Sequence, residues 1–495
     1  MKKFFNFRPI VFGAICLALG VVASVSSAYI GVWSYLIAVA AIFAPITAFY
    51  IIKKNVSRVV TCVIYLALFS IGFLLLLGYI RVLSFGDQTI VGARIDGVVE
   101  KINPVTMNGY ENHYLILKNV LINGVSIDGN VFLYESSSGI ERGDAVYTSV
   151  ALQKISDPFS NLFLLENRVA YVGLDVTSVY LTEKGSGLSN IVINGSRDLL
   201  LEEFAQNQAG TMIALLFGDT QYIDDALLDS YQMAGISHIF AVSGLHIGFF
   251  YTILSFLFDK IGVKRYYNTL LVTLVSAVYA YICSSVSAYR AVVMCFIYGL
   301  GKSFGNKQDS LNSIFLSMAI VLLLFPTSIF GVGFLLSYGA VISIALFSKP
   351  FQRLFSFLPK KLGDSFGVSL AVFAGTMPVV LLFFNRASII TVLLNIPLVP
   401  IVAALYPITM FGLIFSALFG YANVFLYLSN VICLGMNKVM GYIDFSPFLI
   451  TYQGNYVPII IYYAVLLLNT DKLNLSDRLR KFALIALPVS ALLLV

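Results

Sequence analysis

Long apolar runs recur along this chain and constrain its fold more than any other feature. A run of about 20 apolar residues can cross a bilayer as one helix. Candidate spans lie at residues 10–30, 33–52, 59–80, 238–258, 268–284, 288–304, 310–326, 331–348, 366–384, 389–417, 419–440, 456–470 and 482–495. Hydrophobic residues make up 59% of the 495 residues and charged residues only 11%. The sequence therefore predicts a polytopic α-helical membrane protein with about 10–13 transmembrane helices.

One long segment interrupts this pattern. Residues 84–209 hold 8 Lys/Arg and 15 Asp/Glu, including all eight glutamates of the chain, whereas the rest holds 23 Lys/Arg against 10 Asp. The basic residues outside the segment cluster in the loops between spans, which is typical of loops that face the cytoplasm. With three spans before the segment, the N-terminus is expected in the cytoplasm and residues 84–237 outside the cell.

The acidic segment itself is patterned as strands. Val, Ile, Tyr and Phe alternate in short runs between Asn-Gly, Asp-Gly and Arg-Gly-Asp turns. Five runs in residues 88–182 suit a small inserted extracytoplasmic β-barrel, and an OB-like barrel is one option. Its aromatic residues could stack on single-stranded nucleic acid, although the net negative charge of the segment opposes a polyanion. A structural or partner-docking module is the alternative. The aromatic residues considered for stacking are Tyr110, Tyr114, Phe132, Tyr134 and Tyr147.

These features predict four regions. They are an N-terminal three-span membrane region (1–83), an extracytoplasmic OB-like β domain (84–190), connecting and interfacial amphipathic helices (191–237) and a transmembrane core (238–495). In the third region, 198–218 reads as one helix with Asn194 or Ser196 as its N-cap. A short amphipathic helix follows within 218–235 and is expected to lie on the outer membrane surface.

The stretch ISHIFAVSGLHIGFF, residues 236–250, carries two of the three histidines inside an apolar run. If the stretch forms one helix, His238 and His246 stand about 12 Å apart along the axis and cannot share a metal ion. Ser243 and His246 can touch at this spacing, but a hydrolytic pair would need an orienting acid and an oxyanion hole. The spacing of Gly244 and Gly248 is typical of closely packed helices. Pure packing and the lining of a pathway remain open alternatives for this polar face.

At these residues the chain resembles the ComEC family of bacterial competence proteins. The likeness rests on GD…AGISHIFAVSGLHIG, on SAYRAVVM (287–294), on FPTSIFGVGFLLSYGAV (325–341) and on the stretch 374–400 that ends in NIPLVP. The family often continues into a metallo-β-lactamase-like domain, whose H-x-H-x-D-H motif does not occur in these 495 residues. The resemblance is therefore to a short form that lacks this domain. Leu335 also stands where the family often has Gln.

The resemblance implies a channel in the bacterial cell membrane through which single-stranded DNA enters the cytoplasm during natural transformation. The positions that it marks as DNA-path or core residues are Gly218, Asp219, His238, Ser243, Gly244, His246, Arg290, Gly333, Ser337, Asn395 and Pro397. From the residues alone, Arg290 could meet phosphate, although a place at the outer membrane interface is favoured. Asn395 and Pro397 interrupt a long apolar run, so a broken helix that lines a path and an ordinary proline kink both remain open.

The expected partners are single-stranded DNA, membrane lipid, a DNA receptor, a separate cytoplasmic motor and further copies of the chain. A separate motor is expected because GLGKS (299–303) lacks the first glycine of a phosphate-binding loop, where Phe296 stands. No catalytic activity, cofactor or metal site is expected, and the five cysteines form no C-x-x-C pair. The alternative is a polytopic small-solute transporter, or a non-catalytic membrane scaffold derived from such a channel.

Overall fold

The structure is a computed structural model, and it describes residues 8–25, 33–52, 56–83, 89–107, 110–135, 139–155, 162–174, 176, 178–283, 285–304, 309–452, 456–471 and 477–492. The chain divides into two compact units. The first unit comprises Pro9–Val192 and Phe315–Gly331, and the second comprises Met1–Arg8, Ile193–Ile314 and Val332–Val495. The division of the sequence into four regions stays a prediction.

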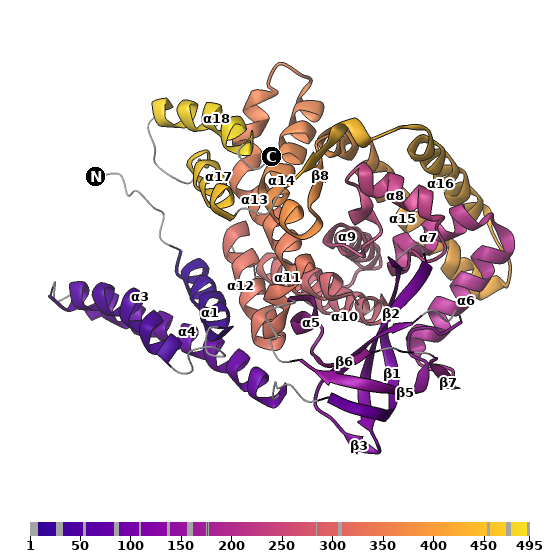
Figure 1. The fold of residues 1–495 in the computed structure, drawn as a ribbon. Coiled ribbons are helices and arrows are strands. Elements are labelled where there is room, and N and C mark those ends of the chain that lie inside the picture. The colour runs from indigo at the N-terminus through magenta and orange to yellow at the C-terminus, as the bar shows by residue number, and fades with distance from the viewer. Residues whose placement is uncertain are drawn as a thin grey trace. The chain divides into compact units, whose positions relative to one another are not determined.

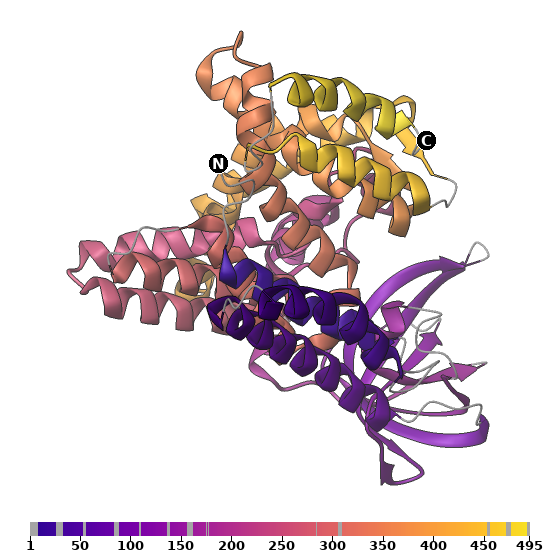
Figure 2. The same cartoon turned by 90° about the vertical axis from the view of Figure 1, so that its left-hand side faces the viewer.

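Three long helices open the first unit and pack side by side (Figure 2). They are α1 (Pro9–Val25), α3 (Trp33–Ile52) and α4 (Val56–Leu83). Glycines set the approach of α1 to α4. A Cβ on Gly20 would overlap the carbonyl oxygen of Phe69, and a Cβ on Gly72 would overlap that of Leu17. Small residues allow this backbone contact between helices in a membrane.

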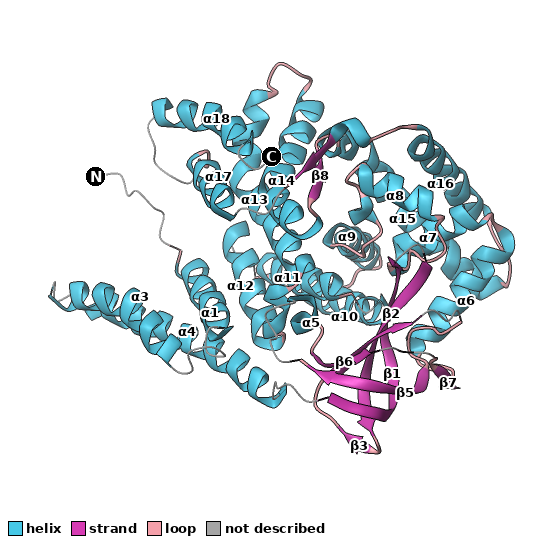
Figure 3. Ribbon diagram, viewed as in Figure 1, coloured by secondary structure: helices cyan, strands magenta, loops and turns pink. Residues whose placement is uncertain are grey.

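The strands of the first unit form a closed barrel (Figure 3). They are β1 (Thr89–Met107), β2 (Tyr110–Ile122), β3 (Val125–Ser126), β4 (Asn130–Glu135), β5 (Ala145–Lys154), β6 (Val169–Leu174) and β7 (Tyr180–Glu183). Hydrogen bonds run around the ring β1-β2-β4-β6-β5 and back to β1, with β4–β6 as its parallel pair. The predicted OB-like inserted barrel is confirmed. The last predicted strand run is in fact two strands, β6 and β7.

Side chains alternate across the barrel wall, as the pleat of a strand requires. Along β5, Val146, Val150 and Leu152 are buried inside the barrel, whereas Tyr147 between them faces outward. A second, smaller apolar cluster lies on the outside of β2, β4 and β6, where the short helix α5 (Leu162–Glu166) covers Ile116 and Phe132. The barrel therefore has one covered outer face.

Helices dominate the second unit (Figure 1). They are α7 (Gln206–Phe217), α8 (Asp225–Met233), η1 (Ser237–Ile239), α9 (Gly244–Lys260), α10 (Arg265–Cys283), α11 (Val286–Ser303), α13 (Val332–Leu354), α14 (Lys360–Phe384), α15 (Thr391–Phe419), α16 (Val424–Tyr442), η3 (Ser446–Phe448), α17 (Tyr456–Leu468) and α18 (Asp477–Leu492). A small hairpin pairs β8 (Arg386–Ser388) with β9 (Leu449–Thr451). Helices α6 (Leu188–Glu203) and α12 (Ser310–Leu324) each have residues in both units.

Each predicted span overlaps mainly with one of the helices α1, α3, α4 and α9–α18, and the span 238–258 also includes η1. Seven helical segments among the described residues are long and apolar enough to cross a membrane, by length and composition. These segments are Val56–Gly78, Ser237–Lys260, Arg265–Cys283, Val332–Leu354, Lys360–Phe384, Thr391–Phe419 and Val424–Tyr442. Shorter apolar helices include α1, α12 and α17. The chain thus has the helices of a multi-pass membrane protein.

Two helix predictions were wrong. The predicted helix 198–218 is two helices that meet near Ala205, and the proposed caps Asn194 and Ser196 lie inside α6. The break separates an amphipathic helix from α7, whose residues 209–216 are all buried. The stretch 236–250 is also not one helix, because α9 begins only at Gly244.

Candidate functional site

The end of the buried helix α7 places the Gly-Asp pair. Gly218 ends the helix with φ +80°, a left-handed conformation that glycine adopts at little cost, and its N–H donates to the Ala214 carbonyl at 2.9 Å. The next residue, Asp219, accepts hydrogen bonds from the backbone N–H of Gln221 at 3.1 Å and from its Nε2 at 2.7 Å. Asp219 therefore holds the turn that leads into α8.

His238 lies in the one-turn helix η1, and its side chain is exposed. The segment before it is fixed on α15. Gly235 has φ +73° and lies so close to Thr391 that a Cβ would overlap the threonine hydroxyl, which donates to the Ala234 carbonyl at 2.9 Å. These contacts direct the chain away from α8, so no continuous helix joins His238 to His246.

Ser243 and His246 together begin helix α9. Ser243 has the extended backbone of an N-cap, and His246 occupies the third helical position, where a capping box usually carries Glu or Gln. The backbone N–H of Ser243 donates to Nδ1 of His246 at 3.1 Å. Because Nδ1 accepts this bond, a neutral ring carries its proton on Nε2. His246 thus caps the helix, a role that the sequence prediction missed although S-x-x-H has the spacing of a capping box.

The His246 ring is buried against aromatic residues of other helices. It stacks on Tyr406 of α15 with ring centroids 4.9 Å apart, and Tyr406 meets Tyr279 of α10 edge to face at 6.3 Å. His246 therefore packs three helices together rather than facing an open surface.

The turn between η1 and α9 joins the other matched segments. A Cβ on Gly218 would lie 3.6 Å from the Phe240 carbonyl oxygen, and one on Gly244 would lie 3.7 Å from Cβ of Ala291 on α11. Ser285, which precedes α11, donates from Oγ to the Val242 carbonyl at 3.2 Å. Residues 240–246 therefore contact both the Gly-Asp turn and the start of α11.

Arg290 of α11 extends this set to α13. Its side chain is 1% exposed, its Nη2 donates to the Gly333 carbonyl at 2.6 Å, and its guanidinium carbon lies 5.7 Å from the centre of the Phe334 ring. Whether Arg290 lies at the depth of the outer membrane interface stays a prediction. The guanidinium is enclosed by protein, where a carbonyl and an aromatic face offset part of its desolvation.

The remaining matched residues lie farther along α13 and α15. Ser337 follows Gly333 by one turn, on the same face of α13, and is half-buried. Asn395 has a buried Oδ1 without a partner among the described residues, and Pro397 is exposed. None of the three has a recorded hydrogen bond to the set formed by Gly218, the 240–246 turn, Arg290 and Gly333, which we call the core cluster.

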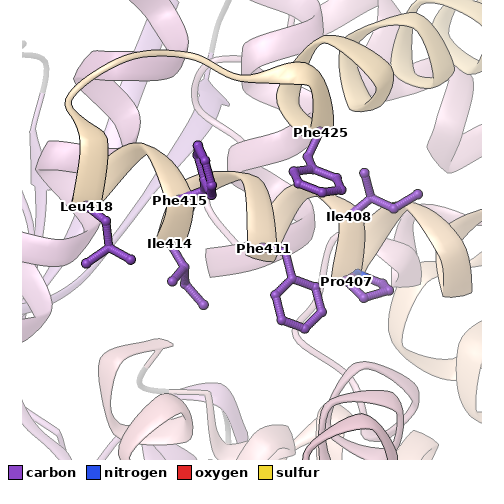
Figure 4. Close-up of a pocket in the computed structure, with 7 residues that line it drawn as sticks. All are labelled: Pro407, Ile408, Phe411, Ile414, Phe415, Leu418 and Phe425. Atoms are coloured by element: carbon purple, nitrogen blue, oxygen red, sulfur yellow. The ribbon is translucent and has the colours of Figure 1, made fainter. Parts of the chain in front are cut away.

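The proposed break at Asn395 and Pro397 is not seen, because α15 continues from Thr391 to Phe419 with three prolines inside it. Apolar grooves flank this helix instead. One of about 420 Å³ is lined by Pro407, Phe411, Phe415 and their neighbours, with Phe425 from α16 beside them (Figure 4). Another of about 670 Å³ includes Pro397 and Pro400. The continuous course of α15 through its three prolines agrees with the ordinary tolerance of proline in membrane helices.

The close helix approach predicted at Gly248 is also wrong, since a Cβ there would meet nothing within 4 Å. Glycine is needed elsewhere. A Cβ on Gly299 of α11 would overlap the Tyr251 hydroxyl, and a Cβ on Gly375 of α14 would overlap Oγ of Ser343 on α13. The G-x-x-x-G spacing alone did not reveal which glycine faces a neighbour.

A profile of the competence protein family matches residues 215–470, slightly more than half of the chain and including every residue of the core cluster. The chain belongs to the competence protein family. The resemblance found in the sequence is thereby confirmed. Together with the seven long apolar segments, this makes the competence-family chain a multi-pass membrane protein.

Three relatives show how far this likeness extends. ComE operon protein 3 of Bacillus subtilis is 32% identical over 195 residues, which cover 39% of this chain and 25% of the relative. Recombination protein 2 of Haemophilus influenzae is 26% identical over 273 residues, which cover 50% of this chain and 32% of the relative. An uncharacterized protein of Aquifex aeolicus is 26% identical over 259 residues, which cover 51% of this chain and 59% of the relative. The chain thus spans less than two thirds of each relative, and no solved structure matches it.

A buried polar network that sequence reasoning missed joins residues just before the matched region to α8 and α16 within it. Asn437 of α16 accepts from the Tyr231 hydroxyl at 2.9 Å, and its Nδ2 donates to the Asn207 carbonyl at 3.1 Å and to Oγ1 of Thr211 at 3.0 Å. Burial raises the pKa of Tyr231, so its hydroxyl stays protonated and donates. The network ties α7 and α8 to α16, and so fixes the helix whose end is Gly218.

Replacing Asn437 with leucine should lower the free energy of unfolding by about 1–3 kcal/mol, because the buried Tyr231 hydroxyl loses its acceptor. Tyr231→Phe is the matched control. It removes the same bond but leaves no unpaired hydroxyl, so about 1 kcal/mol is expected. Thermal unfolding of the purified protein in detergent measures both. An Asn437→Leu protein as stable as the parent would contradict this role.

No group of three His, Cys, Asp or Glu side chains that could hold a metal ion occurs among the described residues. The helical-spacing argument that separated His238 from His246 no longer applies, since the two lie in different elements. All five cysteines are free thiols.

Proposed function

We propose that this chain conducts a single strand of external DNA across the bacterial cytoplasmic membrane during natural transformation. Membership of the competence protein family supports a role in DNA uptake, as do relatives named for a competence operon and for recombination. The conducted species and the direction are our inference, because the chain spans only part of those relatives.

The buried guanidinium of Arg290 is the observation that carries the proposal. An ionisable group inside a helical membrane bundle is costly and is retained mainly where a pathway or a ligand needs it. Arginine is suited to the phosphate groups that give DNA its charge. Arg290 donates to the carbonyl of Gly333, which is an exposed residue, so the buried guanidinium lies next to an accessible part of α13.

The 240–246 turn supplies the accessible part of this region. Ala241, Gly244 and Leu245 are exposed, although the residues between and after them are largely buried. Because the turn contacts the start of α11, its accessible residues lie near the helix that carries Arg290. We infer that the strand passes this turn, with Arg290 as its nearest buried cation.

Orientation follows from charge. Basic residues collect in the loops that share a side with the N-terminus, and the barrel lies in the segment of net negative charge. We therefore propose that the N-terminus lies in the cytoplasm and residues 84–237 outside the cell. With this orientation the barrel meets incoming DNA first, after a DNA receptor, and a separate cytoplasmic motor draws the strand through a channel built from one or more copies of the chain.

Conduction needs no chemical step by the core cluster. Oγ of Ser243 lies 3.3 Å from Nδ1 of His246, but that nitrogen already accepts the Ser243 backbone N–H. No acid holds the opposite ring nitrogen among the described residues. The pair thus has the geometry of a helix cap, and we propose a non-catalytic role for it.

Import of labelled DNA tests the proposal. A transformable host that lacks the gene is complemented with the parent chain, and duplex DNA labelled on either strand is supplied. Label from one strand should reach the cytoplasm only when the chain is present. Normal arrival of label in the deletion strain would refute the uptake role. A defect in small-solute uptake with normal DNA entry would instead support the transporter alternative.

A further inference from the structure

The outer surface of the barrel offers two aromatic faces, and one of them is partly covered. OB-folds commonly bind oligonucleotides on the face of their second and third strands, which here are β2 and β4. Phe163 of α5 covers that face, edge-on to Tyr114 at 5.4 Å and to Phe132 at 6.2 Å, and Phe132 is only 5% exposed. Of the five aromatic residues expected to stack on nucleic acid, Tyr114 and Phe132 are thus used for packing. Tyr134 and Tyr147 are 42% and 37% exposed, and the side chain of Tyr110 lies outside the described residues.

The other face carries an exposed stack. Tyr147 of β5 and Tyr180 of β7 are register partners, and their rings stack 5.1 Å apart at 21°. Arg94 of β1 lies over the Tyr147 ring at 5.4 Å. Tyr147 is 37% exposed and Tyr180 is 52% exposed. This set, which we call the β1–β5–β7 platform, thus presents aromatic surface and one guanidinium to solvent.

The barrel interior does not need these side chains. The interior is formed by the alternate residues, among them Ile95, Val146 and Val150, which are buried. Stacked rings held across neighbouring strands are a rigid surface on which unpaired bases can lie, and such stacking is tolerant of sequence.

We propose that the β1–β5–β7 platform binds unpaired nucleobases of single-stranded DNA through stacking on Tyr147 and Tyr180. The inference rests on the proposed function, and it moves the contact from the β2–β4 face to the face formed by β1, β5 and β7. Double-stranded DNA, whose bases are already stacked in pairs, is not a ligand of this surface.

Charge around the platform predicts how salt affects binding. Arg94 is paired with Asp96 at 3.2 Å, so the surface carries little net positive charge. Stacking, rather than phosphate attraction, then supplies most of the affinity. Contact of Arg94 with one phosphate predicts a slope of about −0.7 for the logarithm of the binding constant against that of salt concentration. A basic groove with many phosphate contacts would give a much steeper slope.

Binding of a fluorescent oligothymidylate to the full-length protein in detergent tests the platform. Tyr180→Ala should weaken binding at least about fivefold, since one stacked base contributes about 1–3 kcal/mol. Tyr180→Phe keeps the ring and should bind within about twofold of the parent. Tyr134→Ala removes a tyrosine that is 42% exposed on β4, outside the platform, and should bind normally. Thermal unfolding of each variant checks that the barrel is intact.

Cross-linking gives a second readout that does not depend on variant stability. An oligonucleotide carrying 5-iodouracil should cross-link on irradiation to Tyr147 or Tyr180 of the parent protein. Cross-links confined to other residues, or equal binding by Tyr180→Ala and the parent, would overturn the platform. So would a parent protein that binds no oligothymidylate. The import assay is independent of these outcomes, so normal uptake by Tyr180→Ala with unchanged binding would refute the platform alone.

Discussion

Replacing Arg290 with leucine should lower import of labelled DNA at least about a hundredfold while leaving the amount of protein in the membrane unchanged. An apolar residue of similar volume in place of a buried charge is often neutral or stabilising, and the Gly333 carbonyl that loses its donor belongs to an exposed residue. Loss of import without loss of protein would therefore single out the charge. Quantitative immunoblotting of membranes alongside the import assay measures both quantities.

Arg290→Lys is the matched variant. Lysine keeps the positive charge but not the planar guanidinium that lies over Phe334. Import by this variant should fall between those of the parent and of Arg290→Leu. If the leucine variant imports DNA normally, Arg290 is a packing residue and the proposed phosphate contact is wrong.

Replacing His246 with alanine should reduce import about tenfold, because the α9 N-terminus loses a cap and the ring that stacks on Tyr406. Loss of a helix cap costs about 1 kcal/mol, and the lost stack on a buried tyrosine adds to this. Glutamine at the same position can still accept the Ser243 backbone N–H, as it does in an ordinary capping box. His246→Gln should therefore retain most of the import.

The comparison of these two variants decides what His246 does. Equal loss of import by alanine and glutamine, with normal protein abundance, would mean that the imidazole itself is required. In that case the residue would line the path and not position the 240–246 turn. Thermal unfolding of both purified variants measures their stability, which should fall more for His246→Ala than for His246→Gln.

Hydropathy was enough to locate the helices, since a membrane helix must be apolar along its whole length. The barrel was also predictable, because its Asn-Gly and Asp-Gly turns separate runs of β-branched and aromatic residues. Both signals are local and repeat many times. The first residue of α9 could not be predicted in this way, because the sequence is equally apolar on both sides of Ser243. Only the cap formed by Ser243 and His246 marks where the helix begins.

The core cluster could be predicted in part. The matched motifs include Gly218, Gly244, Arg290 and Gly333, which the structure brings together, and their place on a DNA path stays a prediction. The contacts between these residues could not be predicted from the sequence. Which residue of α13 meets Arg290 of α11 depends on how the two helices pack. The bond between Thr211 and Asn437 spans 226 positions of the chain, and no local pattern indicates it.

Site-specific photo-cross-linking during import tests most directly whether a DNA strand passes the core cluster. A photoreactive amino acid is placed at Ala241, which is exposed in the 240–246 turn, and for comparison at Leu418, which is 74% exposed on the apolar groove of α15. Irradiation while labelled DNA is entering should cross-link the strand at position 241 and not at position 418. Active import with no cross-link at position 241 would contradict the proposed path.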